Sequence, residues 1–99
     1  MTIKLINHGD YGELLLEGRL DSLTVLDVEK IFEKVTQEYR EIVLNLKDLQ
    51  YISSAGLRLI KITYMALKKK DGNLALKNVN KMCMEVFEMT GFAGFLTFI

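Results

Sequence analysis

The sequence contains no proline and no tryptophan, and it has only one cysteine and one histidine. A lone cysteine, Cys83, cannot form an internal disulfide. A lone histidine, His8, excludes a metal site or a catalytic relay built from several histidines, and its polar neighbours predict a plain surface turn. No Walker loop and no G-x-G-x-x-G motif follows a predicted strand. We therefore expect a protein that is not an enzyme, with no catalytic residues, no cofactor and no bound metal.

The sequence also lacks a charge of one dominant sign. Thirteen Lys and Arg balance thirteen Asp and Glu, so the formal net charge is zero, whereas broad capture of nucleic acid or of an anionic membrane needs a basic surplus. No apolar run approaches the roughly 18 residues of a membrane-spanning helix, and the start of the chain lacks the apolar core of a signal peptide. We expect a soluble cytoplasmic protein without direct nucleic-acid binding and without membrane insertion.

What the chain does have is a regular succession of apolar patterns. With 49% hydrophobic residues, 99 residues can form one domain, 1–99, with its own core. Strands are predicted at 3–6, 13–20, 41–46, 73–79 and 95–99, and helices at 21–40, from 54 to the lysine run at 68–70, and at 80–91. The order β-β-α-β-α-β-α-β indicates the α/β class with a mixed sheet. It begins with an antiparallel hairpin, and the second and third helices connect parallel strands.

Each predicted helix has an apolar stripe that is expected to face the core. The stripes are Val28, Ile31, Phe32, Val35 and Tyr39; Leu57, Ile60, Tyr64 and Leu67; and Val79, Met82, Cys83, Val86 and Phe87. Thr24 and Asp27 are candidates for the cap of the first helix, and Gly91 for the stop after the third. The unbroken apolar run EIVLNL, 41–46, predicts a central strand buried on both faces.

The junction DLQYISSAGLRLI, residues 48–60, passes almost directly from a strand pattern to a helix pattern. Ser54 is well placed to cap this helix, and Gly56 falls in its first turn, where glycine costs roughly 1 kcal/mol relative to alanine. A residue without a side chain suits the close approach of another backbone or of a partner protein. Sites also collect where strands of open α/β sheets end. Ser54 is therefore either a simple cap or a functional group.

The helix after the junction has a second apolar side. Leu59, Ile62 and Met65 lie away from the predicted core stripe and are flanked by Arg58 and Lys61. A domain of this size cannot easily cover both sides of one helix. Burial by the first helix and a surface for a partner protein are the two explanations.

Three segments resemble the motifs of one protein family. The segment IVLNLKDLQYISSAGLRLI, 42–60, is similar to the central motif of STAS domains, specifically of bacterial anti-sigma factor antagonists. EGRLD, 17–21, resembles the Gly-x-Leu-Asp of that family, and VFEMTGF, 86–92, resembles its Phe-x-x-(Ser/Thr)-Gly-(Leu/Phe). Element order and length agree as well, so the resemblance implies a single STAS domain over residues 1–99.

The resemblance implies binding rather than catalysis. In that family the antagonist binds an anti-sigma factor, which is also an ATP-dependent serine kinase, and so frees a sigma factor. Phosphorylation of the serine two residues before the motif glycine ends the binding, and a PP2C-type phosphatase restores it. That serine corresponds to Ser54, and the family's aspartate after Gly-x-Leu corresponds to Asp21, which is then expected near the serine and in the partner interface. The alternative for Asp21, from its place after the second strand, is a cap for the first helix. The implied partner-binding residues are Asp21, Ser53, Ser54, Ala55, Gly56, Arg58, Leu59 and Ile62.

The chain departs from the family at the serine. Many phosphorylated members carry aspartate immediately before it, where this chain has Ser53, and often Ser or Thr after it, where this chain has Ala55. A second hypothesis is therefore a STAS accessory subunit of a transporter complex, such as a lipid-transport ATPase, that works without phosphorylation. A small enzyme is the third hypothesis, and the missing catalytic groups disfavour it.

Overall fold

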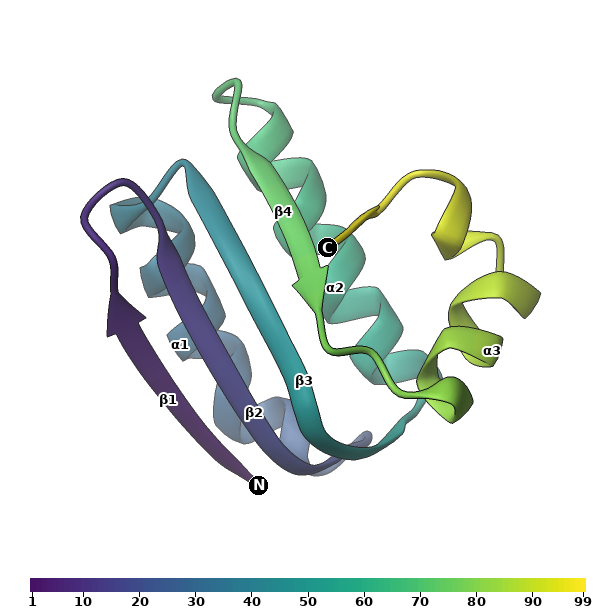
Figure 1. Ribbon diagram of the computed structural model, residues 1–99. Coiled ribbons are helices and arrows are strands. Elements are labelled where there is room, and N and C mark those ends of the chain that lie inside the picture. Colours follow the sequence, from purple (N-terminus) through teal and green to yellow (C-terminus); the bar gives the residue numbers. More distant parts are fainter.

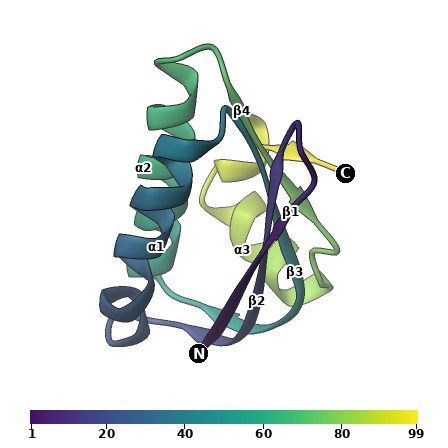
Figure 2. The same cartoon turned by 90° about the vertical axis from the view of Figure 1, so that its left-hand side faces the viewer.

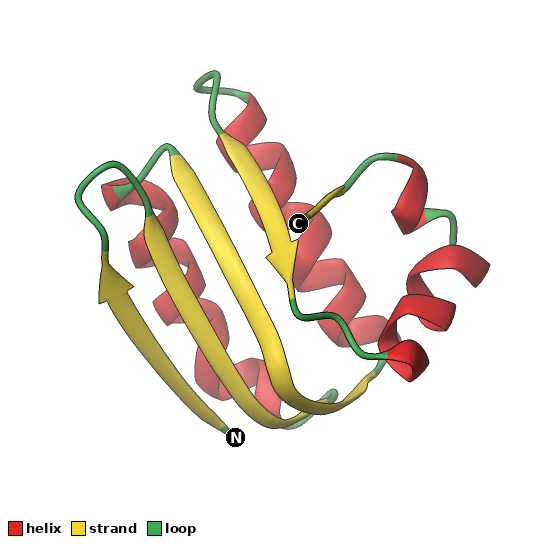
Figure 3. Ribbon diagram, viewed as in Figure 1, coloured by secondary structure: helices red, strands yellow, loops and turns green.

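The strands and helices follow one another in the predicted order (Figure 1). The computed structural model describes residues 1–99 without a gap. Its elements are β1 (Thr2–Asn7), β2 (Gly12–Leu20), α1 (Thr24–Glu38), β3 (Glu41–Ile52), α2 (Ser54–Lys68), β4 (Asn73–Lys77), α3 (Lys81–Met89), the 3-10 helix η1 (Phe92–Gly94) and β5 (Thr97–Phe98). The predicted order is confirmed, and η1 is the element that the sequence does not predict (Figure 3).

The strands form one mixed sheet in the order β1-β2-β3-β4-β5. β1 and β2 are antiparallel, and each later strand is parallel to its neighbour, which confirms the hairpin and both predicted crossovers. Parallel neighbours end at the same edge of a sheet, so β2 and β3 end together, and Leu20 pairs with Ile52. This edge, the lower one in Figure 1, therefore holds the start of α2 beside the end of β2.

β3 is longer than the predicted strand at 41–46. It continues through the polar residues after Leu46 and stays paired with β2 through two register shifts, between Leu15 and Glu17 and between Gly18 and Arg19. Irregularities of this kind increase the local twist of a strand, and Figure 1 shows both strands curving toward the lower edge. The added length carries the chain to the start of α2.

The helices cover only one face of the sheet. Figure 2 shows α1 and α2 packed side by side against that face, whereas the opposite face carries no helix. Leu44 and Leu46 of β3 point into the core and are fully buried, while Val43 on the open face is only partly covered. The prediction that this strand is buried on both faces is therefore wrong, because all the helices lie on the same face of the sheet.

Most of the predicted core is confirmed. Val28, Phe32, Val35, Leu57, Ile60, Leu67, Cys83 and Phe87 are buried, and Val25 joins them. Ile31 is 37% exposed, because the buried stripe of α1 runs through Val25 instead. Met82 is also exposed, and α3 buries Cys83 and Phe87 alone. Burial raises the pKa of the Cys83 thiol, which is the behaviour of a core residue. Gly91 follows α3 in the left-handed region at φ 81°, as expected for a helix stop.

Candidate functional site

The junction between β3 and α2 differs from the prediction by one residue. Ser53, not Ser54, is the N-cap: its backbone is extended (φ −99°, ψ 176°), and its carbonyl accepts the first helical bond from Leu57 N at 2.9 Å. Ser54 is the first helical residue and is exposed to solvent. A residue at this position has no capping duty, so its hydroxyl is available to another protein.

The start of α2 has no side-chain cap. Ser53 Oγ is buried and has no hydrogen-bond partner, and the first turn of α2 contains no acidic residue. α3, by contrast, is capped by Asn80, whose Oδ1 accepts a bond from Cys83 N at 2.8 Å. Free N–H groups and the positive end of the helix dipole therefore remain uncompensated next to Ser54.

Asp21, and not the predicted Asp27, caps the turn that leads into α1, whose N-cap residue is Leu23. Its Oδ1 accepts bonds from the N–H groups of Leu23 and Thr24, both at 3.0 Å, and Thr24 Oγ1 accepts one from Asp21 N at 2.9 Å. This is a reciprocal capping box, in which the predicted Thr24 does take part. The backbone N–H groups of Thr24 and Leu23 hold the pKa of Asp21 below its usual value. Asp21 therefore presents a carboxylate in a fixed position.

A backbone bond brings the two predicted segments together. Ser53 N donates to Leu20 O at 2.9 Å, so the residues directly before Asp21 and directly before Ser54 are hydrogen-bonded to each other. Asp21 also has the guanidinium of Arg19 beside it, with Arg19 Nε 3.9 Å from Asp21 Oδ2. The lower edge of the sheet thus places a serine and a carboxylate from distant parts of the sequence on one surface.

Gly56 does not give a partner room, contrary to the prediction. It is buried, and a Cβ at this position would lie 2.8 Å from Leu20 Cγ and 2.9 Å from Ile52 Cγ1. Both side chains belong to the core. The close approach that the glycine permits is therefore the packing of the first turn of α2 onto the ends of β2 and β3. Gly56 supports the site from inside and is not part of its surface.

A shallow hollow lies between α1 and the first two turns of α2. It is lined by Val25, Glu29, Ser54, Ala55, Arg58, Leu59 and Ile62. Five of these residues belong to the implied partner surface; Val25 and Glu29 do not, although their spacing four and eight residues after Asp21 places them on one face of α1.

The two explanations for the second apolar side of α2 each hold for part of it. Leu59 is 8% exposed and belongs to the core cluster, whereas Ile62 and Met65 remain 53% and 49% exposed. Leu23 and Leu26 at the start of α1 are exposed as well. The hollow beside Ser54 thus has the exposed Ile62 together with Arg58 and Glu29 in its lining, and apolar residues mixed with a few charges are typical of protein-binding sites.

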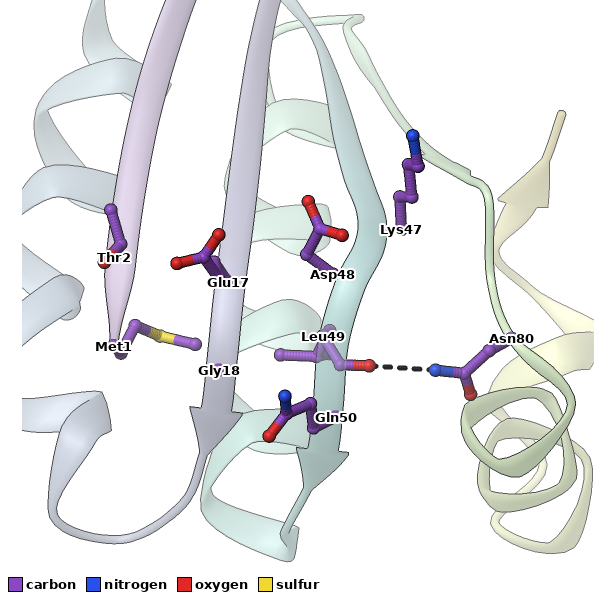
Figure 4. Close-up of a pocket in the computed structure, with 9 residues that line it drawn as sticks. All are labelled: Met1, Thr2, Glu17, Gly18, Lys47, Asp48, Leu49, Gln50 and Asn80. Atoms are coloured by element: carbon purple, nitrogen blue, oxygen red, sulfur yellow. Dashed lines mark hydrogen bonds between the residues drawn. The ribbon is translucent and has the colours of Figure 1, made fainter.

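A second hollow lies on the open face of the sheet (Figure 4). Its polar lining includes the carboxylates of Glu17 and Asp48 on neighbouring strands, and Asn80 Nδ2 donates to Leu49 O at 2.8 Å beside them. It contains no histidine or cysteine, and none of the predicted site residues lines it. The chemistry of this hollow does not suggest a reaction.

His8 lies exposed in the turn between β1 and β2, as predicted, but it also makes two contacts there. Its Nε2 donates to Glu13 Oε1 at 2.7 Å, and its ring stacks on Tyr11 with the centroids 4.5 Å apart. Glu13 is only 7% exposed, and its Oε2 accepts a bond from Asn45 Nδ2 at 3.0 Å. The bonds from Asn45 and His8 outweigh burial and lower the pKa of Glu13 from its ordinary value of 4.5.

This network predicts how stability depends on pH. Because the pKa of Glu13 is lower in the folded state than in the unfolded chain, its contribution is complete above the unfolded value and is lost as pH falls through the folded value. Glu13→Gln should lower stability at neutral pH by about 1 kcal/mol and flatten the acid side of a plot of Tm against pH. Glu17→Gln, an exposed change on the same strand, should leave that acid side unchanged. Equal profiles for the two variants would contradict the role of Glu13.

None of the helices is both long enough and apolar enough to span a bilayer. The candidate site consists of an exposed serine at an uncapped helix start, a fixed carboxylate on the hydrogen-bonded neighbouring segment and a partly apolar hollow next to the serine. This arrangement is suited to binding another protein.

Comparison with known proteins identifies the class. The family model of the STAS domain matches residues 3–99. The anti-sigma-B factor antagonist of Staphylococcus epidermidis is 33% identical over 92 residues, with 92% of this chain and 85% of the relative covered. The antagonist of the same name from Staphylococcus aureus is 30% identical with the same coverage. The chain belongs to the STAS domain family.

Solved structures confirm the fold. An anti-sigma factor antagonist from Mycobacterium paratuberculosis superposes with a TM-score of 0.88 at 19% identity, covering 98% of this chain and 83% of that one. The Bacillus protein SpoIIAA in its phosphorylated form gives a TM-score of 0.77 at 19% identity, with 99% and 91% covered. The sequence relatives of this chain are named for antagonism of another protein and not for a reaction. This confirms the prediction that the chain is not an enzyme.

Proposed function

We propose that this STAS domain is a cytoplasmic anti-sigma factor antagonist whose binding is controlled by phosphorylation of Ser54. The unmodified domain binds an anti-sigma factor that is also a serine kinase, and a sigma factor is released. Transfer of the γ-phosphoryl group of ATP to Ser54 Oγ, with ADP as the leaving product, ends the binding, and a PP2C-type phosphatase restores it by hydrolysis. The observation that carries this proposal is the exposed Ser54 at the uncapped start of α2.

The geometry favours Ser54 over Ser53 as the phosphoacceptor. Ser53 Oγ is buried, so a kinase can reach it only after the junction opens. Ser54 is exposed, and a phosphate on its side chain lies near the free N–H groups of the first turn, which favour an anion. The relative SpoIIAA is known in an unphosphorylated and a phosphorylated form, which supports a phosphorylated state of this fold.

Peptide mapping tests the assignment. The anti-sigma factor is isolated by co-purification with this protein from native cells and is incubated with the pure domain and ATP. Mass spectrometry should find phosphate on Ser54, Ser54→Ala should remain unmodified, and Ser53→Ala should still be phosphorylated. Phosphate found on Ser53 alone would overturn the assignment.

Asp21 is expected to contact the anti-sigma factor while it caps α1. Asp21→Asn keeps most of the capping ability but loses the small stabilisation that the lowered pKa of the carboxylate implies, so Tm should fall only slightly. The loss of one charge-assisted hydrogen bond across the interface should weaken binding about tenfold. Isothermal calorimetry measures the affinity. Asp27→Asn is the matched control, because Asp27 is exposed on the same helix and caps nothing; a large fall in Tm with intact binding for Asp21→Asn would show a purely structural role.

Ser53 in place of the family's aspartate favours the second candidate, a transporter accessory subunit that is not phosphorylated. The same co-purification separates the two functions. A kinase-like ATPase among the bound proteins supports the antagonist, and the subunits of a lipid-transport ATPase without a kinase support the accessory subunit.

A further inference from the structure

The guanidinium of Arg58 is the one arginine head group without a partner in the domain. Arg19 lies beside Asp21 and over the ring of Tyr51, 4.2 Å from its centroid, and Arg40 Nε donates to Lys70 O at 3.2 Å. Arg58 is exposed and makes no ion pair, hydrogen bond or ring contact of this kind. Its charge is free to act on a group that the unmodified domain does not have.

Arg58 lies one helical turn after Ser54 on the same side of α2. Residues four apart on a helix are neighbours, with Cβ atoms roughly 5–6 Å apart, and a negative group that precedes a positive one in this spacing is the favourable order. Both residues line the same hollow. The reach of an arginine side chain spans the distance to a phosphate on Ser54, and a guanidinium can bind two phosphate oxygens at once.

Two carboxylates act in the opposite sense. Glu29 on α1 lines the same hollow, and Asp21 lies on the neighbouring segment after β2. Neither is paired with Arg58 in an ion pair. Their charges repel a phosphate on Ser54. The net electrostatic effect of the neighbouring side chains on that phosphate therefore depends on whether Arg58 turns toward it.

We propose that Arg58 is the internal counter-ion of phosphorylated Ser54, and that phosphorylation thereby withdraws Arg58 from the surface offered to the partner. This inference rests on the proposed function for its biological meaning. In the unmodified domain the guanidinium is available to a carboxylate of the partner. In the phosphorylated domain it binds the phosphate, and the partner loses this contact in addition to meeting a new negative charge.

A titration of the phosphate measures the pair without any partner or kinase. Phosphoserine is inserted at position 54 of the full chain during translation, and its second ionisation, near pH 6 for a free phosphoserine, is followed by phosphorus NMR. Arg58→Gln should raise this pKa by about 0.3 unit, the shift expected for an exposed ion pair between residues four apart. Arg58→Lys should restore part of the difference, because it returns the charge without the two-oxygen geometry.

Two variants serve as controls on the charge. Lys61→Gln removes a cation one turn beyond Arg58 on the same helix. Residue 61 lies roughly 10 Å along the helix axis from residue 54, which is more than the screening length at physiological salt. The phosphate pKa should therefore not change. Glu29→Gln should lower that pKa. If Arg58→Gln titrates like the unchanged protein, or if Lys61→Gln shifts the pKa equally, the proposal is overturned. Because the phosphoserine is inserted during translation, a failure of the kinase to modify Ser54 would overturn the proposed function and leave this result unaffected.

Discussion

The domain phosphorylated at Ser54 is expected to keep its circular dichroism spectrum and its Tm, while its affinity for the anti-sigma factor falls at least about a hundredfold. The fold should survive because the phosphate lies at the uncapped start of α2, where the first turn has no acidic residue. An anion at a helix N-terminus stabilises by roughly 0.3–1 kcal/mol.

The loss of affinity has its origin in the interface. A phosphoserine carries about −1.5 to −2 charges at pH 7. A partner that fits the neutral Ser54 and the apolar residue Ile62 would have to take this charge out of water, and the exposed Arg58 offsets only a small part of it. A buried charge that is not fully compensated costs several kcal/mol. Each 1.4 kcal/mol is a factor of ten in affinity. Unfolding is therefore unnecessary for the switch.

Two substitutions separate the charge from the loss of the hydroxyl. Ser54→Ala should bind the anti-sigma factor like the unmodified domain and should never be switched off. Ser54→Asp should bind poorly, although one charge reproduces only part of the effect of a phosphate. Calorimetric titration and thermal melts of the phosphorylated domain measure affinity and stability on the same sample. A Tm several degrees lower, or binding that remains tight, would contradict this mechanism.

The fold could be predicted from the sequence because its elements are signalled locally. Apolar periodicity identified all five strands and three α-helices, and right-handed crossovers fixed the parallel pairs. Which face of the sheet the helices cover is not a local property. The apolar run at 41–46 therefore suggested burial on both faces, although one face is open.

The candidate site could be located but not resolved in detail. Ser54 and Asp21 were identified from motifs, and a bond between Leu20 and Ser53 connects their segments. Whether Ser53 or Ser54 caps α2 depends on backbone angles that two adjacent serines do not reveal. Asp21, the alternative cap in the sequence, and not Asp27, caps the turn into α1, because the chain turns directly after β2. The role of Gly56 was misjudged because its neighbours, Leu20 and Ile52, come from strands that only the fold places beside it.

The buried position of Gly56 predicts that Gly56→Val lowers the stability of the domain by about 3 kcal/mol, at the upper end of the usual cost of overpacking a core. The first added carbon already lies within 3 Å of Leu20 and Ile52, and both are core residues that cannot move into solvent. Valine regains only a few tenths of a kcal/mol of helix propensity over glycine, so little offsets this cost. For a domain of this size, Tm should fall by more than about 10 °C.

Gly94→Val is the matched control, because a Cβ at Gly94 meets no atom within 4 Å, and it should change Tm little. Below its lowered Tm, Gly56→Val should still bind the anti-sigma factor within about threefold of the unchanged protein, a difference of less than 1 kcal/mol. The binding surface of this variant changes only if the first turn of α2 shifts, because residue 56 is itself buried. If Gly56 instead left room for the partner, the substitution would abolish binding and leave Tm unchanged. Tm and affinity together therefore distinguish two roles of Gly56: supporting Ser54 from within the core, or contacting the anti-sigma factor directly.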